Sequence, residues 1–150
     1  MKNIFAYLIC YFSVIVCVSA ENLNKPHHLS VFLGGTHMFD EDHNGETIGL
    51  DYEYCVSEIL GLGFVIEHAY EDIDATTFLT VADIHTSIGA IFQVGPGIEF
   101  TDHGDRFLFR VGTMYEFKFE DFTLSPQLHY DLAKNAPDSV VFGFAIGKSF

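Results

Sequence analysis

The sequence predicts an all-β protein, an eight-stranded antiparallel up-and-down transmembrane β-barrel. Three observations support this fold class. Large apolar side chains alternate with small or polar ones through eight segments of roughly 9–12 residues, the length that a tilted strand needs to cross a bilayer. After residue 20 no run approaches the ~20 apolar residues of a spanning helix, although 49% of the chain is hydrophobic. The last of the alternating segments, 140–150, ends in Phe150.

The first twenty residues have the layout of a secretory signal peptide. They contain one lysine, an apolar run over residues 4–18 and the small-residue end Val18-Ser19-Ala20. We therefore expect a signal peptide at 1–20 and an outer-membrane β-barrel domain at 21–150. A membrane-anchoring helix is the alternative for the same run. Cleavage would leave Cys55 as the one cysteine, so that no intramolecular disulfide could hold the fold.

Each strand is predicted from its own alternation. The second strand is the clearest, because Ile48, Leu50 and Tyr52 face one way while Gly49 and Asp51 face the other. Alternation does not show which face of the first strand points outward, because two glycines lie in its middle. It does not show this for the fourth strand either, because apolar residues lie on both of its faces. In chain order the strands are predicted at residues 29–39, 47–56, 60–67, 76–85, 90–100, 106–117, 122–131 and 140–150.

Two prolines interrupt this scheme. Pro96 lies inside the fifth predicted strand and Pro126 inside the seventh. A closed barrel has no free edge at which a missing backbone N–H would be harmless. We therefore expect residues 95–97 to form a β-bulge, and Pro126 to mark either a bulge or a late strand start.

The charge balance limits the partners. The formal net charge is −14, and the segment 21–150 carries all 21 acidic residues with six of the seven lysines and arginines. So acidic a surface argues against nucleic acid as a partner. The acids concentrate in alternate connections, which are longer than the others. Short periplasmic turns and longer outer loops give this pattern in outer-membrane barrels, so the acidic loops are expected to face outward.

The residues of the polar face decide which face is outside. That face is rich in glycine and also carries an expected interior charge network, which comprises Asp51, Glu53, Glu67, Glu99, Arg110 and Glu116. The interior of an eight-stranded barrel is just wide enough to be filled by side chains, so glycines would make room for the long ones. We expect the apolar face to contact lipid, with aromatic residues near both ends of the strands. A soluble barrel or sandwich with an apolar core is the alternative.

Several short stretches carry a resemblance to known proteins. They are Gly95-Pro96-Gly97-Ile98-Glu99-Phe100, Phe107-Leu108-Phe109-Arg110-Val111-Gly112, Tyr115-Glu116-Phe117 and Leu124-Ser125-Pro126. With the leader and the alternating strands, they resemble the small outer-membrane barrels of Gram-negative bacteria, of the OmpX and OmpA transmembrane-barrel class, and a family of short outer-membrane barrels without assigned activity.

The resemblance implies a porin-like barrel of the cell envelope, in contact with outer-membrane lipid and lipopolysaccharide. It also implies that Phe150 belongs to the signal read by the barrel-assembly machinery in the C-terminal strand. It brings no catalytic residue to this chain.

Arg110 is the most informative single residue of the polar face. It is one of two arginines and is predicted in the middle of a strand, with Glu99, Glu116 and Glu67 as its expected partners. An unpaired charge inside the barrel would be costly, so pairing is expected. Such a network could plug the interior or gate a narrow pore, and we favour the plug because eight strands leave little lumen.

Other constellations are weaker. Ser125, His129 and Asp131 share one face and have the composition of a nucleophile, a base and an orienting group. However, residues four apart on a strand are ~13 Å apart, so Ser125 and His129 could not hydrogen-bond directly. We assign no catalytic residue and expect no enzyme. Cys55 is expected to face inward as a small filler.

Two acidic loops contain a histidine. His43 follows the acids at 40–42, and His103 lies between Asp102 and Asp105. The spacing matches no metal-binding motif, so we expect a solvated acidic rim that binds divalent cations weakly at most, with no metal centre and no cofactor.

The expected function is that of a non-enzymatic integral outer-membrane protein serving envelope integrity or surface interaction. Two alternatives stay open, a lipid-modifying outer-membrane enzyme and a narrow channel or small-ligand carrier.

Overall fold

The computed structural model describes residues 25–39, 43–102 and 104–150, so the predicted signal peptide lies outside the described residues. Within those ranges the elements are all strands, and no helix is long and apolar enough to cross a membrane. The strands are β1 (His27–Met38), β2 (His43–Cys55), β3 (Leu60–Ala69), β4 (Ala75–His85), β5 (Ala90–Thr101), β6 (Gly104–Tyr115), β7 (Phe117–Lys118), β8 (Thr123–Ala133) and β9 (Ser139–Ser149).

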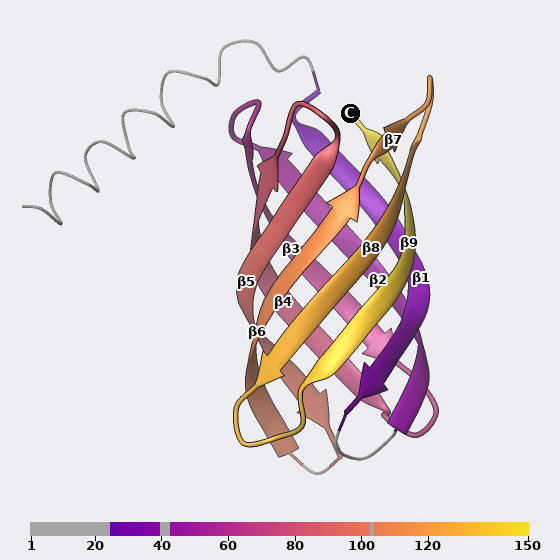
Figure 1. Ribbon diagram of the computed structural model, residues 1–150, viewed down its shortest axis with the longest axis vertical. Helices are drawn as coiled ribbons and strands as arrows, with labels where there is room; N and C mark the ends of the chain where they lie inside the picture. The colour runs from indigo at the N-terminus through magenta and orange to yellow at the C-terminus, as the bar shows by residue number, and fades with distance from the viewer. Residues whose placement is uncertain (1–24, 40–42, 103) are drawn as a thin grey trace, which may run out of the picture.

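The strands close into a barrel (Figure 1). Neighbours in sequence pair antiparallel, and β1 pairs with β9 from His28↔Ser149 to Met38↔Ser139. The two-residue β7 continues β6, and both pair with β8. The nine labelled strands therefore form a barrel of eight strands, with β6 and β7 together counting as one. The predicted eight-stranded antiparallel barrel is therefore confirmed.

The two ends of the barrel differ. One end, called the terminal end here, holds the start of β1, the C-terminus and the turns after β2, β4 and β7 (Figure 1). The opposite end, called the loop end, holds the connections after β1, β3, β5 and β8. The connection after β5 is shorter than predicted, because β5 continues to Thr101 and β6 starts at Gly104. Thr101, Gly104 and Asp105, which the sequence placed in a loop, are therefore paired within the sheet.

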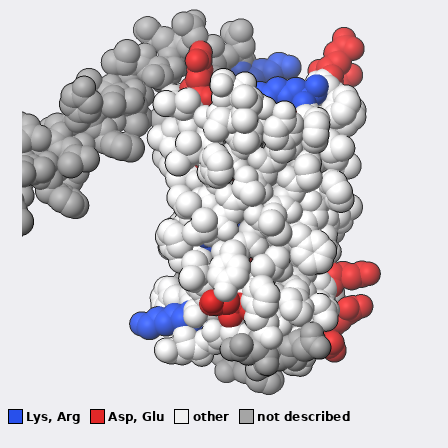
Figure 2. Space-filling view, in the orientation of Figure 1, with Lys and Arg blue, Asp and Glu red and all other residues white. Residues whose placement is uncertain are grey.

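The outer wall of the barrel is apolar. Figure 2 shows charged side chains gathered at the two ends, with a wall between them that is almost free of charge on the visible face. Phe107 is 66% exposed and Phe144 is 59% exposed, whereas Arg110 is 1% exposed and Glu67 is 4% exposed. The predicted orientation, apolar side chains outside and charges inside, is therefore confirmed. The aromatic residues predicted near the strand ends are also exposed: Tyr54, Tyr70, Phe100, Phe107, Tyr115, Phe117, Phe122, Tyr130 and Phe150.

The strand pairing decides the faces that the sequence left undecided. In β4, Leu79 and Val81 point inward and Phe78 points outward. In β1, Phe32 points inward, and its ring covers the two glycines Gly34 and Gly143, which lie opposite each other on β1 and β9. A Cβ on either glycine would collide with the backbone of the facing strand and with that ring.

The expected bulge at Pro96 is wrong. The register between β4 and β5 is the same before and after the proline, as Leu79↔Gly97 and Ala82↔Val94 show. No residue is inserted. Instead, the pairing has a gap where Pro96, which lacks an N–H, faces β4. The Thr80 hydroxyl donates to the Pro96 carbonyl across this gap (3.4 Å).

Pro126 is accommodated in the same way, so a bulge or a late strand start there is also wrong. β8 begins at Thr123, before the proline, and Pro126 pairs in register with Phe144 of β9. On the other side, pairing with β6 ends at Met114↔Gln127 and resumes in register with β7. The break between β6 and β7 therefore lies opposite the proline, where a ladder hydrogen bond has no donor.

Candidate functional site: the barrel interior

A buried ion triad crosses the middle of the barrel. Arg110 of β6 donates from Nε and Nη2 to the two carboxylate oxygens of Asp131 on β8, both at 2.7 Å. The same guanidinium donates from Nη1 and Nη2 to the carboxylate oxygens of Glu67 on β3, at 2.8 and 2.6 Å. Both contacts use the planar fork of arginine, which matches a carboxylate in two places. The triad therefore joins two sides of the barrel wall with one cation and two anions.

Other large side chains fill the space around the triad. Phe32 and His129 are 1% exposed, and so is Gln93. His129 Nε2 shares a hydrogen bond with Gln127 Oε1 (3.0 Å). With Arg110 these are the largest fully buried side chains among the described residues, so the interior around the triad is occupied by side chains.

Inward glycines make room for the long inward side chains. Gly49 lies opposite Glu67, and Gly112 lies opposite His129. A Cβ at Gly49 would be 2.8 Å from Glu67 Cγ, and one at Gly112 would collide with the ring of His129. The sequence pattern of glycines alternating with apolar residues therefore encodes the space for these long side chains.

The structure brings Glu67 to Arg110 but not Glu99 or Glu116. Glu99 lies directly opposite Arg106 across the β5–β6 hairpin and forms an ion pair with it near the loop end. Glu116 lies at the terminal end, with its carboxylate 3.1 Å from Lys118 Nζ. These two acids are thus too far along their strands to reach the middle of β6, and they have nearer cations.

Sequence reasoning missed Asp131 as a partner of Arg110. The available signal was the register, because Arg110 and Asp131 are directly opposite each other on β6 and β8. The register could not be fixed from the sequence, since the break between β6 and β7 hides the length of the turn. Because both oxygens of Asp131 bind Arg110 while His129 bonds Gln127, Asp131 does not orient His129 as a catalytic set with Ser125 would require.

The remaining two predicted interior charges lie nearer the terminal end. Glu53 is buried, and its Oε1 is 2.5 Å from His85 Nε2 on β4. The Cys55 thiol donates to the same Oε1 (3.7 Å). Asp51 and Asp83 lie further inside, and each has a buried Oδ1 without a hydrogen-bond partner. This half of the interior therefore concentrates carboxylates.

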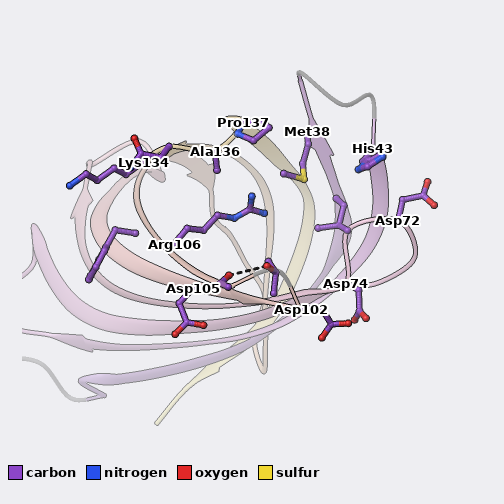
Figure 3. A pocket seen from close by; sticks show the side chains of 15 residues that line it. Met38, His43, Asp72, Asp74, Asp102, Asp105, Arg106, Lys134, Ala136 and Pro137 are labelled. Carbon is purple, nitrogen blue, oxygen red and sulfur yellow. Dashed lines mark hydrogen bonds between the residues drawn. The ribbon is translucent and has the colours of Figure 1, made fainter.

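A pocket of about 700 Å³ opens at the loop end (Figure 3). Arg106 reaches across it, with Lys134 on one side and Asp72, Asp74 and Asp102 on the other. Of the predicted acidic rim, His43, Asp102 and Asp105 line this pocket, whereas residues 40–42 and His103 lie outside the described residues.

The comparisons with known proteins concern the fold. Neither a family model nor a curated protein sequence matches the chain. Among solved structures, the N-terminal β-barrel domain of Pseudomonas aeruginosa OprF is 12% identical, with a TM-score of 0.59 over 82% of this chain and 97% of that one. Ail, the attachment invasion locus protein of Yersinia pestis, is 11% identical, with a TM-score of 0.59 over 85% of this chain and 100% of that one. A de novo designed transmembrane β-barrel is 16% identical, with a TM-score of 0.54 over 83% of this chain and 98% of that one. The chain therefore has the fold of the small eight-stranded outer-membrane β-barrels.

Proposed function

We propose that the protein is a non-enzymatic integral outer-membrane protein, a plugged barrel that serves envelope integrity or surface interaction through its loop end. The observation that carries the proposal is the Arg110 triad. A buried ion triad with four charge-assisted hydrogen bonds, which spans the interior from β3 to β6 and β8, suits a rigid anchor better than a conduit.

The apolar wall supports the membrane location. Exposed phenylalanine, leucine, isoleucine and valine side chains cover the outer face of the barrel strands. This apolar surface is far larger than the apolar patches that soluble proteins expose. In a closed barrel every backbone polar group of the wall can be paired within the sheet, which is the condition for crossing a bilayer. One fold neighbour, Ail, is described as an outer membrane protein, in agreement with this location.

The loop end suits contact with the cell exterior. Its pocket is lined by Asp72, Asp74, Asp102 and Asp105, against Arg106 and Lys134. Because Arg106 is already paired with Glu99, the rim has an excess of negative charge. A structure of Ail holds the heparin analogue sucrose octasulfate. The acidic rim of this chain would repel such a polyanion, so we propose a neutral or cationic partner, or lipopolysaccharide phosphates bridged weakly by divalent cations.

The C-terminal strand is the proposed contact with the assembly machinery. Phe150 is exposed at the terminal end, and its backbone pairs with His27, with N–H to carbonyl distances of 2.8 and 3.1 Å. Its ring also stacks on the His27 ring, 5.4 Å between centroids. The closing seam of the barrel thus ends in an accessible aromatic group, as an assembly signal requires.

Two measurements test the proposal. The first is fractionation of expressing cells with gel electrophoresis of boiled and unboiled samples. We expect the protein in the outer-membrane fraction, with a mobility that shifts on boiling, whereas a soluble periplasmic product would refute the location. The second is conductance in planar lipid bilayers. We expect no current above protein-free controls, and discrete channel openings would refute the plug.

A further inference from the structure

We propose that Glu53, Cys55 and His85 form a binding site for a borderline divalent cation, with Zn²⁺ as the best match, at the terminal end of the barrel interior. One carboxylate oxygen, the thiol sulfur and one imidazole nitrogen all lie within 4.8 Å of one another. Carboxylate, thiolate and imidazole are the three ligand types that zinc takes in proteins. The site lies about as far from the loop end as the fold allows, so it is separate from the acidic rim.

The sheet geometry explains why the three side chains meet. Glu53 and Cys55 belong to β2, and His85 belongs to β4, so β3 lies between them. β3 offers glycines at the positions that face this part of the interior, since Gly63 lies opposite Glu53 and Gly61 opposite Cys55. A Cβ at Gly61 would collide with the carboxylate of Glu53. The absent side chains of β3 are therefore what lets β2 and β4 reach each other across it.

The distances suit a tetrahedral ion after a small adjustment. Zinc bonds of about 2.0 Å to nitrogen and oxygen and about 2.3 Å to sulfur separate the ligand atoms by roughly 3.3–3.6 Å. Glu53 Oε1 and Cys55 Sγ are 3.7 Å apart, already near this value. Glu53 Oε1 and His85 Nε2 are 2.5 Å apart because they now bond each other, so the carboxylate must turn by about 1 Å to admit the ion.

A separate observation, the surplus of buried carboxylates, also favours a cation here. Asp83 and Asp51 line the same small cavity as Glu53, and each has one buried carboxylate oxygen without a hydrogen-bond partner. The single guanidinium at the barrel centre is already shared by two other acids. Buried anions are costly unless a cation compensates them, so a divalent ion at Glu53 would stabilise this half of the interior.

The ion can reach the site from the terminal end. The side chain of His85 is 19% exposed, and Cys55 is half-buried beside the turn after β2. A cavity of about 10 Å³ adjoins Glu53, with His28, Asp83 and Glu116 in its walls, and this is close to the space that one water molecule needs. Three protein ligands with water in the fourth position is the arrangement of an open zinc site.

Cobalt spectroscopy tests the site on the protein purified from membranes into detergent micelles and stripped with a chelator. Co²⁺ replaces Zn²⁺ in such sites, and a cysteine ligand gives a sulfur-to-cobalt charge-transfer band in the near ultraviolet. We expect this band to saturate at one equivalent of Co²⁺ and to disappear on addition of one equivalent of Zn²⁺. Absence of the band, or binding that gives no thiolate signature, would overturn the proposal.

Protection of the thiol gives a second readout that needs no variant. We expect Zn²⁺ to slow alkylation of Cys55 by iodoacetamide at least about tenfold, measured by mass spectrometry of the peptide that contains this residue, whereas Mg²⁺ should have no such effect. Equal alkylation rates with and without Zn²⁺ would count against the site.

Matched variants then identify the ligands. His85→Gln and Cys55→Ser should each weaken Zn²⁺ binding by more than about tenfold. Gly61→Ala should also weaken it, because the new Cβ would push the Glu53 carboxylate out of position although all three ligand side chains are still present. His68→Gln is the control, because His68 also lies next to an acid, 3.7 Å from Asp74, but at the loop end. Each variant is first shown to fold by its heat-modifiable mobility. Affinity that falls in the control and not in His85→Gln would place the ion at the acidic rim and refute the site.

Discussion

Replacing Arg110 should be among the most damaging single changes in this barrel. In Arg110→Met, Glu67 and Asp131 would lose four hydrogen bonds and face each other as two buried carboxylates without a cation. Removing one partner of a buried ion network costs about 3–5 kcal/mol, because the charge left behind is uncompensated. We expect a loss of this size in the free energy of unfolding.

Neutralising the whole triad should recover part of this lost stability. Replacing the whole triad by neutral groups, in Glu67→Gln with Arg110→Met and Asp131→Asn, removes the uncompensated charges, and such replacements are often close to neutral. The triple variant should therefore be more stable than Arg110→Met alone. Arg106→Met is the matched control, since Arg106 pairs with one acid and its side chain is 19% exposed, and it should cost clearly less.

The assay is reversible urea unfolding of the barrel in lipid vesicles, with the folded fraction read from the mobility of unboiled samples. Equal free energies for the wild type and Arg110→Met would show that the triad contributes nothing. A triple variant as unstable as the single one would show that lost packing, and not uncompensated charge, is the cause.

Three further changes test the wall, the packing and the assembly signal. Phe144→Arg, in the middle of the outer face of β9, should lower the free energy of unfolding in vesicles by about 2–4 kcal/mol, whereas Phe107→Arg near the loop end should lower it by about 0–1 kcal/mol. Equal losses would mean that depth in a bilayer does not matter. Gly143→Val should lower the free energy of unfolding by about 1–3 kcal/mol in the same urea assay, because the valine side chain would collide with the backbone of β1 and with the Phe32 ring. An unchanged urea midpoint of unfolding would disprove that close approach. Deletion of Phe150 should lower the amount of folded protein in the outer membrane of cells while leaving refolding in detergent nearly unchanged, and an equal loss in both measurements would indicate a structural role instead.

Period and composition were sufficient to predict the fold and its orientation. Alternation in β2 and β9 could be read directly because every second residue is large and apolar. Alternation did not decide β4, because Leu79 and Val81 are as apolar as Phe78, and packing against Val65 and Leu108 inside the barrel selects the inward pair. Small inward apolar clusters of this kind give no signal in sequence, since they follow the contacts between strands.

The prolines and the ion partners depend on register, which the sequence leaves free. A bulge was expected at Pro96 because a central strand needs every N–H, but the ladder tolerates a local gap instead of an inserted residue. The pair Glu99 and Arg106 is an exception, because the short connection between β5 and β6 would have allowed the two residues to be matched. Arg110 and Asp131 could not be matched in this way, because the length of the β7–β8 turn becomes clear only once the pairing of Phe117 with Leu124 is known.

The triad also bears on how the barrel is built. Glu67 belongs to a strand of the first half of the chain, and its cation arrives 43 residues later, followed by Asp131 a further 21 residues on. A partly inserted sheet that ends before β6 would carry an unneutralised acid with no partner across the lumen. We therefore expect insertion to be cooperative, because the hairpins that precede β6 leave Glu67 without the guanidinium that neutralises it.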